Sequence, residues 1–435
     1  METLLERALV AASQVSTYEL RGTVTDMTGL IIEGTGPLVP VGSQVEIRSG
    51  SHIIPAQVVG FRSDRILLMP FSEVEGIAPG STITACAGTN RVSVCAGLQG
   101  RVIDALGNPL DGQPLPVMNE SVPLFRDPPN PVTRTRIHHC LDLGVRAMNG
   151  LLTVGEGQRV GIMAGSGVGK STLLGMVAKH SHSDVNVIAL VGERGREVRE
   201  FIERDLGPEG LARSIVVVAT GNQSALLRIR AAFVATAIAE YFRDQGKKVM
   251  LMVDSITRLA MAQREVGLAV GEPPSTRGYT PSVFSVLPRL LERAGTCEGE
   301  GSITGLYTVL VEGDDMNEPV ADAVRGILDG HVVLSRRLAG RGHYPAIDVL
   351  QSISRVMSDI VEPEVLKMAT EVRDILASYQ EVEDLITIGA YKAGQNPRVD
   401  RAVQKHEKVL SFLKQSADRP CSLEECWRSM KEIVS

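Results

Sequence analysis

A short glycine-rich segment between an apolar run and a helical pattern constrains this chain more than any other feature. "AGSGVGKST" occupies residues 164–172, directly after the run "QRVGIMA" and at the start of the helical pattern "STLLGMVAKH". Glycine permits the backbone angles with which successive N–H groups point at one anion, and a helix amino terminus adds partial positive charge. The segment therefore predicts a phosphate-binding loop between a strand and a helix, with Ala164 where glycine usually leads.

The polar side chains of this loop predict contacts with a nucleoside triphosphate. Lys170 is expected to reach the β and γ phosphates, and the Ser171 hydroxyl is expected to ligate Mg²⁺. The remaining residues expected to bind the nucleotide are Gly165, Ser166, Gly167, Val168, Gly169 and Thr172. The loop by itself does not indicate what the energy of hydrolysis is used for.

Two apolar runs end in acids that suit phosphate chemistry. "VMLMVD" finishes at Asp254, and an aspartate at the carboxyl end of a strand can hold magnesium through water. The alternative is that Asp254 caps a helix. "VIALVG" runs into "GERGRE", where Glu193 is the best candidate to polarise the attacking water. Arg194 and Arg258 are candidates to stabilise charge or to position Glu193, and each has a plain salt-bridge alternative.

The 435 residues exceed one ordinary core, which indicates two or three domains. An apolar stripe over residues 3–15 predicts a helix within segment 1–17, which either packs on its own domain or docks a partner. Short β-branched runs broken by Gly and Pro predict a small closed β barrel over residues 18–91.

Beyond the barrel, apolar strands alternate with helical stretches. This pattern predicts an α/β core with a parallel sheet flanked by helices over residues 92–361, including a Gly/Pro-rich connection over 92–149. A helix is predicted from Ser224 to Gln245, with Gly246 as its stop. Residues 362–435 predict a helical domain interrupted at "ITIGAYKAGQNPRVD" by a helix-loop-helix tip.

Composition restricts the partners of the chain. The net charge of −6 argues against a nucleic-acid or membrane binder that uses its whole surface. The six cysteines are scattered without a CxxC pair, which favours free thiols in a reducing cytosol. The amino terminus is not a signal peptide, and no stretch is apolar enough for a membrane span, so we expect a cytoplasmic protein.

Four segments resemble one family closely. "AGSGVGKST", "VGERGREVREF" and the segments 226–295 and 301–336 are similar to the type III export ATPases, relatives of the catalytic (beta) subunit of the rotary ATP synthase. The similarity extends over nearly the whole chain and implies a RecA-like P-loop ATPase core. "VRGILDGHVVLSR" favours the flagellum-specific branch, and the injectisome (virulence) branch is the alternative.

The resemblance assigns further site residues. Lys170, Ser171, Glu193, Arg194 and Asp254 fall on positions with which the family handles ATP and Mg²⁺. Two residues are added by the resemblance alone: Tyr344, which would stack on adenine, and Arg355, which would act in trans as an arginine finger. An arginine supplied by a neighbouring subunit implies a ring, and the family implies a homohexamer.

The resemblance also implies a function and partners. The chain would be the ATPase of a flagellar export apparatus, where it releases substrates from chaperones, unfolds them and delivers them to the export gate. The carboxyl helices and the loop in segment 271–289 would meet a coiled-coil central stalk, and the helix at 3–15 would meet a regulatory partner. The protein would be cytoplasmic and peripheral to the membrane. The tip "GAYKAGQNP" lacks the acids of the rotary subunit, so we do not infer ATP synthesis.

Two other classes are less well supported. A Rho-like RNA translocase needs basic grooves and aromatic stacking platforms, but the barrel segment offers only Tyr18, Phe61 and Phe71. We therefore expect no nucleic-acid partner. A subunit of an ATP synthase or vacuolar-type pump is disfavoured by the continuous similarity to export ATPases.

Overall fold

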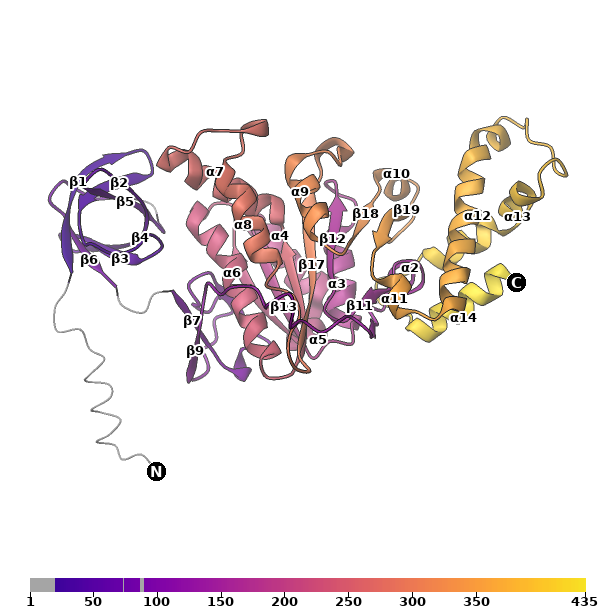
Figure 1. Cartoon of the computed structure of the whole chain (residues 1–435), viewed down its shortest axis with the longest axis horizontal. Coiled ribbons are helices and arrows are strands. Elements are labelled where there is room, and N and C mark those ends of the chain that lie inside the picture. The colour runs from indigo at the N-terminus through magenta and orange to yellow at the C-terminus, as the bar shows by residue number, and fades with distance from the viewer. Residues whose placement is uncertain (1–19, 73, 87–89) are drawn as a thin grey trace, which may run out of the picture.

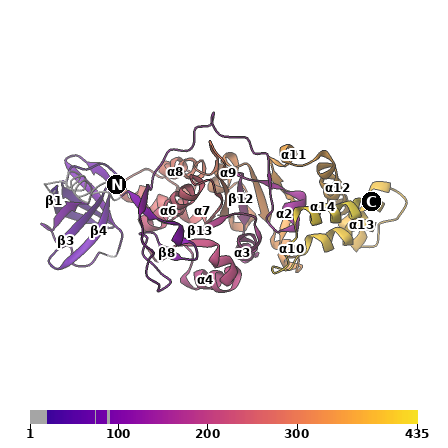
Figure 2. The same ribbon diagram turned by 90° about the horizontal axis from the view of Figure 1, so that it is seen from below.

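The computed structural model describes residues 20–72, 74–86 and 90–435. Three parts lie in a row: a β barrel at one end, an α/β core in the middle, and a group of helices at the other end (Figures 1 and 2). The helix predicted over residues 3–15 lies outside the described residues. Among the described residues, no helix combines the length and apolar character needed to cross a bilayer.

The barrel is closed, with its strands in the order β1-β2-β5-β4-β3-β6. The strands are β1 Arg21–Thr28, β2 Ile31–Thr35, β3 Gln44–Ser49, β4 His52–Arg62, β5 Arg65–Pro70 and β6 Thr82–Ala85. Alternate residues of β3 and β4 point inward, because side chains alternate along a strand; the fully buried ones are Val45, Ile47, Ala56 and Val58. The predicted closed barrel is confirmed.

The core is built on a nine-stranded sheet with the order β19-β18-β12-β17-β15-β13-β14-β8, and the short β16 pairs with β17. Its strands run parallel except β16 and β19. They are β8 Val102–Asp104, β12 Arg159–Ala164, β13 Val185–Val191, β14 Ser214–Ala219, β15 Lys248–Asp254, β16 Gly295–Thr296, β17 Ser302–Leu310, β18 Gly330–Leu334 and β19 Ile347–Ser354.

Helices cover both faces of this sheet. They are α2 Arg146–Leu151, α3 Lys170–His180, α4 Gly195–Glu200, a π-helical turn Phe201–Leu206, α5 Gly207–Ala212, α6 Ala225–Arg243, α7 Ile256–Val270, α8 Pro281–Leu291, α9 Pro319–Ile327 and α10 Arg336–Gly340. Strand β13 shows why both faces are apolar: Val187 packs in the layer under α6 to α9, whereas Ile188 packs in the layer under α3. Buried parallel strands are apolar on both sides for this reason.

Local signals explain where elements begin and end. Ser224 caps α6 by accepting a hydrogen bond from Leu227 N, and Gly246 takes a φ of 80° just after it. The helix predicted from Ser224 to Gln245 is therefore confirmed. The core strands predicted from the sequence correspond to β12, β13, β14, β15 and β17. The edge strands β8 and β19 and the inner strand β18 were not predicted, and β8 belongs to the segment described as a connection. Three residues are too few to show strand periodicity in β8.

The remaining elements join and close the structure. They are the paired strands β7 Arg91–Val94 and β9 Glu120–Pro123, the paired strands β10 Cys140–Leu141 and β11 Val154–Gly155, the 3₁₀ turns Ala96–Leu98, Thr276–Gly278 and Glu312–Asp314, and the helices α11 Met357–Ile360, α12 Pro363–Thr387, α13 Pro397–Leu413 and α14 Leu423–Val434. The predicted tip lies between α12 and α13. Its backbone is ordered by Asp400, whose carboxylate accepts a hydrogen bond from Gly394 N.

The register of the sheet determines where polar groups gather. Ala164 at the end of β12 lies beside Leu310 of β17 and Leu334 of β18, and Asp254 at the end of β15 lies beside Leu190 of β13. Segments that follow these parallel strands therefore meet at one edge of the sheet, which is the edge where α/β proteins bind ligands.

Candidate active site

A cavity of about 520 Å³ opens at this carboxyl edge of the sheet. Most of the loop 164–172 lines it, together with residues 192–194, Arg258 and Arg336. The loop has the conformation that anion binding requires. Gly167 takes a φ of 77°, and Gly169 takes a φ of 91° and caps the amino terminus of α3. These left-handed angles are accessible to glycine without strain, and they turn the backbone toward the cavity side of the helix start.

Lys170 joins the two predicted acids. Its Nζ lies 2.5 Å from Asp254 Oδ1 and 3.2 Å from Glu193 Oε1. The structure therefore brings together three residues that are separated by as many as 84 positions in the sequence. Ser171, Glu193 and Asp254 also line one small recess beside the cavity.

Asp254 is held in place by a neighbouring strand. Thr308 Oγ1 of β17 donates a hydrogen bond of 2.6 Å to Asp254 Oδ1, and both side chains are buried. A buried carboxylate needs such partners to offset its lost hydration. The sequence interpretation missed Thr308, although the parallel pairing of β15 with β17 makes the ends of these strands neighbours.

Burial changes the pKa values of Glu193 and Lys170. Burial raises the pKa of Glu193 to about 7, and the nearby charge of Asp254 and a hydrogen bond with Glu197 act in the same direction, while Lys170 opposes them. Burial alone would lower the pKa of Lys170, but Asp254 and Glu193 outweigh it and the pKa is raised. Lys170 thus stays positive, and Glu193 exchanges its proton near neutral pH.

The arginines are placed differently from one another. The Arg194 side chain is 83% exposed and pairs with Glu197 at 3.6 Å, so the structure does not show it positioning Glu193. Arg258 lies against Gly192, and its Nε is buried without a hydrogen-bond partner among the described residues. Arg336 was missed: a Cβ built on Gly165 would lie 2.6 Å from its Nε. It follows β18, the strand beside β12, and that adjacency is the signal for it.

Tyr344 lies beside the phosphate loop but is not among the residues that line the cavity. A Cβ built on Gly169 would lie 3.6 Å from its ring atoms, and 47% of the residue is exposed. Its ring therefore lies against the phosphate loop with surface free for stacking.

Arg355 lies at the opposite edge. It directly follows β19, where Ser354 pairs with Gly330 at the start of β18, whereas Leu334 at the end of β18 lies beside Ala164. Four residues of strand separate these positions by about 13 Å. The exposed Arg355 side chain donates to Arg325 O at 3.2 Å and takes no part in the cavity of its own chain.

The donors present fit Mg²⁺ bound with a nucleotide. Among the described residues, no group of three or more His, Cys, Asp or Glu is arranged to hold a metal ion. Mg²⁺ usually takes one or two protein oxygens and completes its octahedron with phosphates and waters. Ser171 and Asp254, which share one recess, supply that kind of partial ligand set.

Comparison with known proteins decides the family. The sequence model "ATP synthase alpha/beta family, nucleotide-binding domain" matches residues 144–354, and "T3SS EscN ATPase C-terminal domain" matches residues 361–432. The flagellum-specific ATP synthase of Bacillus subtilis (strain 168) is 58% identical over 420 residues, which cover 96% of each protein. The chain belongs to the family of flagellum-specific ATP synthases and type 3 secretion system ATPases.

Members of both branches of this family are similar to the chain. A type 3 secretion system ATPase of Xanthomonas euvesicatoria is 49% identical over 436 residues, covering 100% of this chain and 98% of that protein. The assembled ATPase EscN of enteropathogenic E. coli matches with a TM-score of 0.89 at 44% identity, covering 95% of this chain and all of that one; EscN bound to its central stalk EscO matches equally well. The predicted family, fold class and ATPase activity are confirmed.

Proposed function

We propose that this ATPase is the motor subunit of a flagellar protein export apparatus and that it works as a homohexamer with its active sites between subunits. The division of site residues between two edges of the sheet carries this proposal. Lys170, Glu193 and Asp254 converge at one edge, whereas Arg355 lies exposed at the other. A ring lets the second edge of one subunit complete the first edge of the next, and EscN, a relative at 44% identity, is an assembled ATPase.

Within one subunit, the loop would bind the phosphates of ATP. Lys170 would exchange its contacts with Asp254 and Glu193 for the β and γ phosphates. Glu193 is ionised above its pKa of about 7. Its carboxylate would orient the attacking water by accepting a hydrogen bond from it. Ser171 and Asp254 would hold Mg²⁺, which supplies positive charge against the phosphates. Tyr344 would stack on the adenine, and Arg258 would stabilise negative charge beside Glu193.

Between subunits, Arg355 would enter the neighbour's cavity and stabilise charge on the transferred phosphoryl group. An arginine supplied in trans is worth about 10³–10⁵ in rate in other phosphoryl-transfer systems. Arg194, which is exposed and lines the same cavity, would contact the adjoining subunit rather than Glu193.

The partners follow from the resemblance to the family. The carboxyl helices would meet a coiled-coil central stalk, and the relative EscN forms a complex with its central stalk EscO. The segment 1–17 would bind a regulatory partner, and chaperone–substrate complexes and the export gate would be the clients of the ring. Such a ring would be cytoplasmic and peripheral to the membrane export apparatus.

A mixing experiment tests the shared site. Lys170→Ala disables the phosphate loop of a subunit, and Arg355→Ala removes the arginine that it supplies to its neighbour. Each variant alone should therefore lose turnover. In mixed rings, the intact phosphate loop of an Arg355→Ala subunit can meet Arg355 of a neighbouring Lys170→Ala subunit. Mixing the two inactive proteins should therefore restore part of the ATP hydrolysis. Mixtures that stay inactive, although mixed rings form by mass photometry, would contradict the proposal.

The branch and the client are tested in cells. The hypothesis of a flagellar ATPase is favoured by the 58% identity to the Bacillus subtilis protein. An injectisome ATPase is the second candidate because of the Xanthomonas relative. Lys170→Ala in the source organism should abolish filament export and motility while basal structures remain. Loss of effector secretion with normal motility would favour the injectisome. Hydrolysis that depends strongly on added RNA would instead indicate a translocase.

A further inference from the structure

The short helix α10 lies between the phosphate cavity and the carboxyl helical domain. Its first residue, Arg336, faces the cavity, where a Cβ built on Gly165 would lie 2.6 Å from Arg336 Nε and 2.8 Å from Nη2. Ser335 caps the helix by accepting a hydrogen bond from Leu338 N. Any rotation or shift of this single turn therefore moves the Arg336 guanidinium relative to the phosphate loop.

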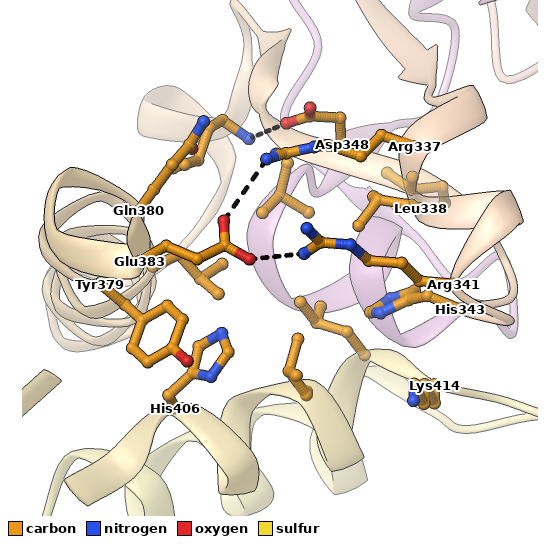
Figure 3. Close-up of a pocket in the computed structure, with 16 residues that line it drawn as sticks. Arg337, Leu338, Arg341, His343, Asp348, Tyr379, Gln380, Glu383, His406 and Lys414 are labelled. Carbon is orange, nitrogen blue, oxygen red and sulfur yellow. Dashed lines mark hydrogen bonds and ion pairs between the residues drawn. The ribbon is translucent and has the colours of Figure 1, made fainter. Parts of the chain in front are cut away.

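The other side of the turn is tied to α12. Arg341 Nη1 lies 2.6 Å from Glu383 Oε1, and Arg337 Nη1 lies 3.6 Å from Glu383 Oε2 (Figure 3). Arg337 lies within α10 and Arg341 directly follows it. The two arginines are four residues apart and reach the same carboxylate. We call these three side chains the α10 clamp.

Beneath the clamp the two domains are not closely packed. A cavity of about 130 Å³ lies there, with the clamp at one side and the stacked rings of Tyr379 and His406 at another (Figure 3). Its apolar lining includes Leu338, Ile347, Leu376, Leu410 and Leu413. Nearer its start, α12 packs closely on the core, since Val372 and Ile375 share one buried cluster with core residues, so the void is confined to the region beneath the clamp. The ion pairs of the clamp, whose arginines are 47% and 59% exposed, connect α10 to α12 across this void.

The same segment touches the phosphate loop and the helical domain a second time. The Tyr344 ring lies against Gly169, and Tyr344 O accepts a hydrogen bond of 2.9 Å from Gln415 N, between α13 and α14. Residues 336–344 therefore connect two glycines of the loop to two points of the helical domain.

We propose that Glu383 is a positioning residue of the active site: through Arg337 and Arg341 it fixes α10, and α10 places Arg336 beside the triphosphate. The inference rests on the proposed hydrolysis of ATP in this cavity. Occupancy of the cavity and the placement of α12 against the core are then linked, and such linkage is reciprocal.

Steady-state ATP hydrolysis by assembled rings tests the link. Glu383→Gln should raise the KM for ATP about 3- to 10-fold, the effect of losing two partly exposed ion pairs, with a smaller change in kcat. Arg341→Gln should do the same. The matched control is Asp384→Asn, which removes an exposed carboxylate one position further along α12 and should change neither constant. Thermal unfolding checks that each variant folds.

A double-mutant cycle separates positioning from general damage. If Glu383 acts through Arg336, Glu383→Gln should add little in an Arg336→Lys background. A non-hydrolysable ATP analogue should slow amide hydrogen exchange in α12 around Glu383 in the wild type but not in Arg336→Lys. The inference is overturned if Glu383→Gln equals Asp384→Asn, or if its effect persists in full without Arg336. Failure of the proposed function would look different: the wild type would not hydrolyse ATP, or Lys170→Ala would hydrolyse it normally.

Discussion

Lys170 of the phosphate loop and Asp254 at the end of β15 form an ion pair with 2.5 Å between Nζ and Oδ1. Because Lys170 and Asp254 are both largely buried, each charge depends on the other for compensation. Phosphates that draw Lys170 away leave Asp254 in need of a new cation, and Mg²⁺ is the cation that accompanies ATP. The pair therefore predicts that nucleotide and metal bind together.

Replacement of Lys170 tests this coupling. Lys170→Ala should reduce turnover at least about 100-fold, since one charged contact to the transferred group is worth about that much. It should also weaken the dependence of nucleotide affinity on Mg²⁺ that we expect of the wild type, because Asp254 no longer loses a partner when phosphate binds. Titration calorimetry with and without Mg²⁺ measures the affinity. Lys179→Ala, at the far end of α3, is the control and should behave as the wild type.

The hydroxyl that holds Asp254 gives a milder version of the same test. Thr308→Val keeps the side-chain shape but removes the donor of the 2.6 Å hydrogen bond to Asp254, which is worth about 1 kcal/mol. The Mg²⁺ concentration for half-maximal hydrolysis should rise about 3- to 10-fold, while the affinity for metal-free ADP stays the same. An unchanged Mg²⁺ requirement would show that Thr308 does not orient Asp254.

The pKa of Glu193 makes both activity and stability depend on pH. The carboxyl has a pKa of about 7 in the folded protein against an ordinary 4.5. Between these values the folded state keeps a proton that the unfolded chain has lost, so stability falls as pH rises from about 4.5 to about 7. Glu193→Gln cannot titrate, and relative to the wild type it should gain about 2.5 kcal/mol of stability between pH 5 and pH 8.

Two measurements check the role of Glu193. Unfolding midpoints of wild type and Glu193→Gln should diverge with rising pH, whereas Glu209→Gln, at an exposed position of α5, should follow the wild type. Hydrolysis by Glu193→Gln should fall at least about 100-fold at every pH, as expected for a lost general base. A variant that hydrolyses ATP while its midpoints diverge would leave Glu193 as a buried acid without a catalytic role.

The sequence predicted the parts of this molecule that depend on local pattern. The strand "QRVGIMA", the loop after it and the start of α3 follow from spacing and glycine chemistry, and Asp254 and Glu193 were found because buried strands visibly end there. Thr308 and Arg336 were missed, since their importance depends on which strands are neighbours. β12 lies between β17 and β18, an order that parallel pairing of distant segments sets and periodicity does not reveal.

Resemblance supplied what neither pattern nor adjacency could. Tyr344 lies in an irregular segment, and its placement against Gly169 depends on the turn after α10. Arg355 follows an antiparallel edge strand, so its side chain is carried away from the cavity. A residue that would serve the next subunit leaves no mark in the packing of its own chain, and its role remains a prediction.

Adenine stacking by Tyr344 predicts a clear difference between two substitutions. Tyr344→Ala should raise the KM for ATP about 5- to 100-fold, the range for loss of one base–aromatic stack, with kcat little changed. Tyr344→Phe keeps the ring and should stay within about 2-fold of the wild type. Equal KM values for ATP in all three proteins would show that the base does not bind against Tyr344. A similar loss in Tyr344→Phe would instead assign the role to the hydroxyl.

The exposed position of Arg355 predicts that catalysis, but not binding, needs a neighbour. Arg355→Ala should bind a fluorescent ATP analogue with nearly wild-type affinity, because the loop, Lys170 and Tyr344 belong to the same chain. Its turnover should fall about 10³-fold or more.

In the wild type, turnover per chain should fall on dilution as rings dissociate, whereas the low rate of Arg355→Ala should not depend on concentration. Arg428→Ala, which changes an exposed arginine of α14, serves as the control. Wild-type turnover that persists in a dilute, strictly monomeric sample would place the whole catalytic apparatus within one chain, and Arg355 would then be a surface residue.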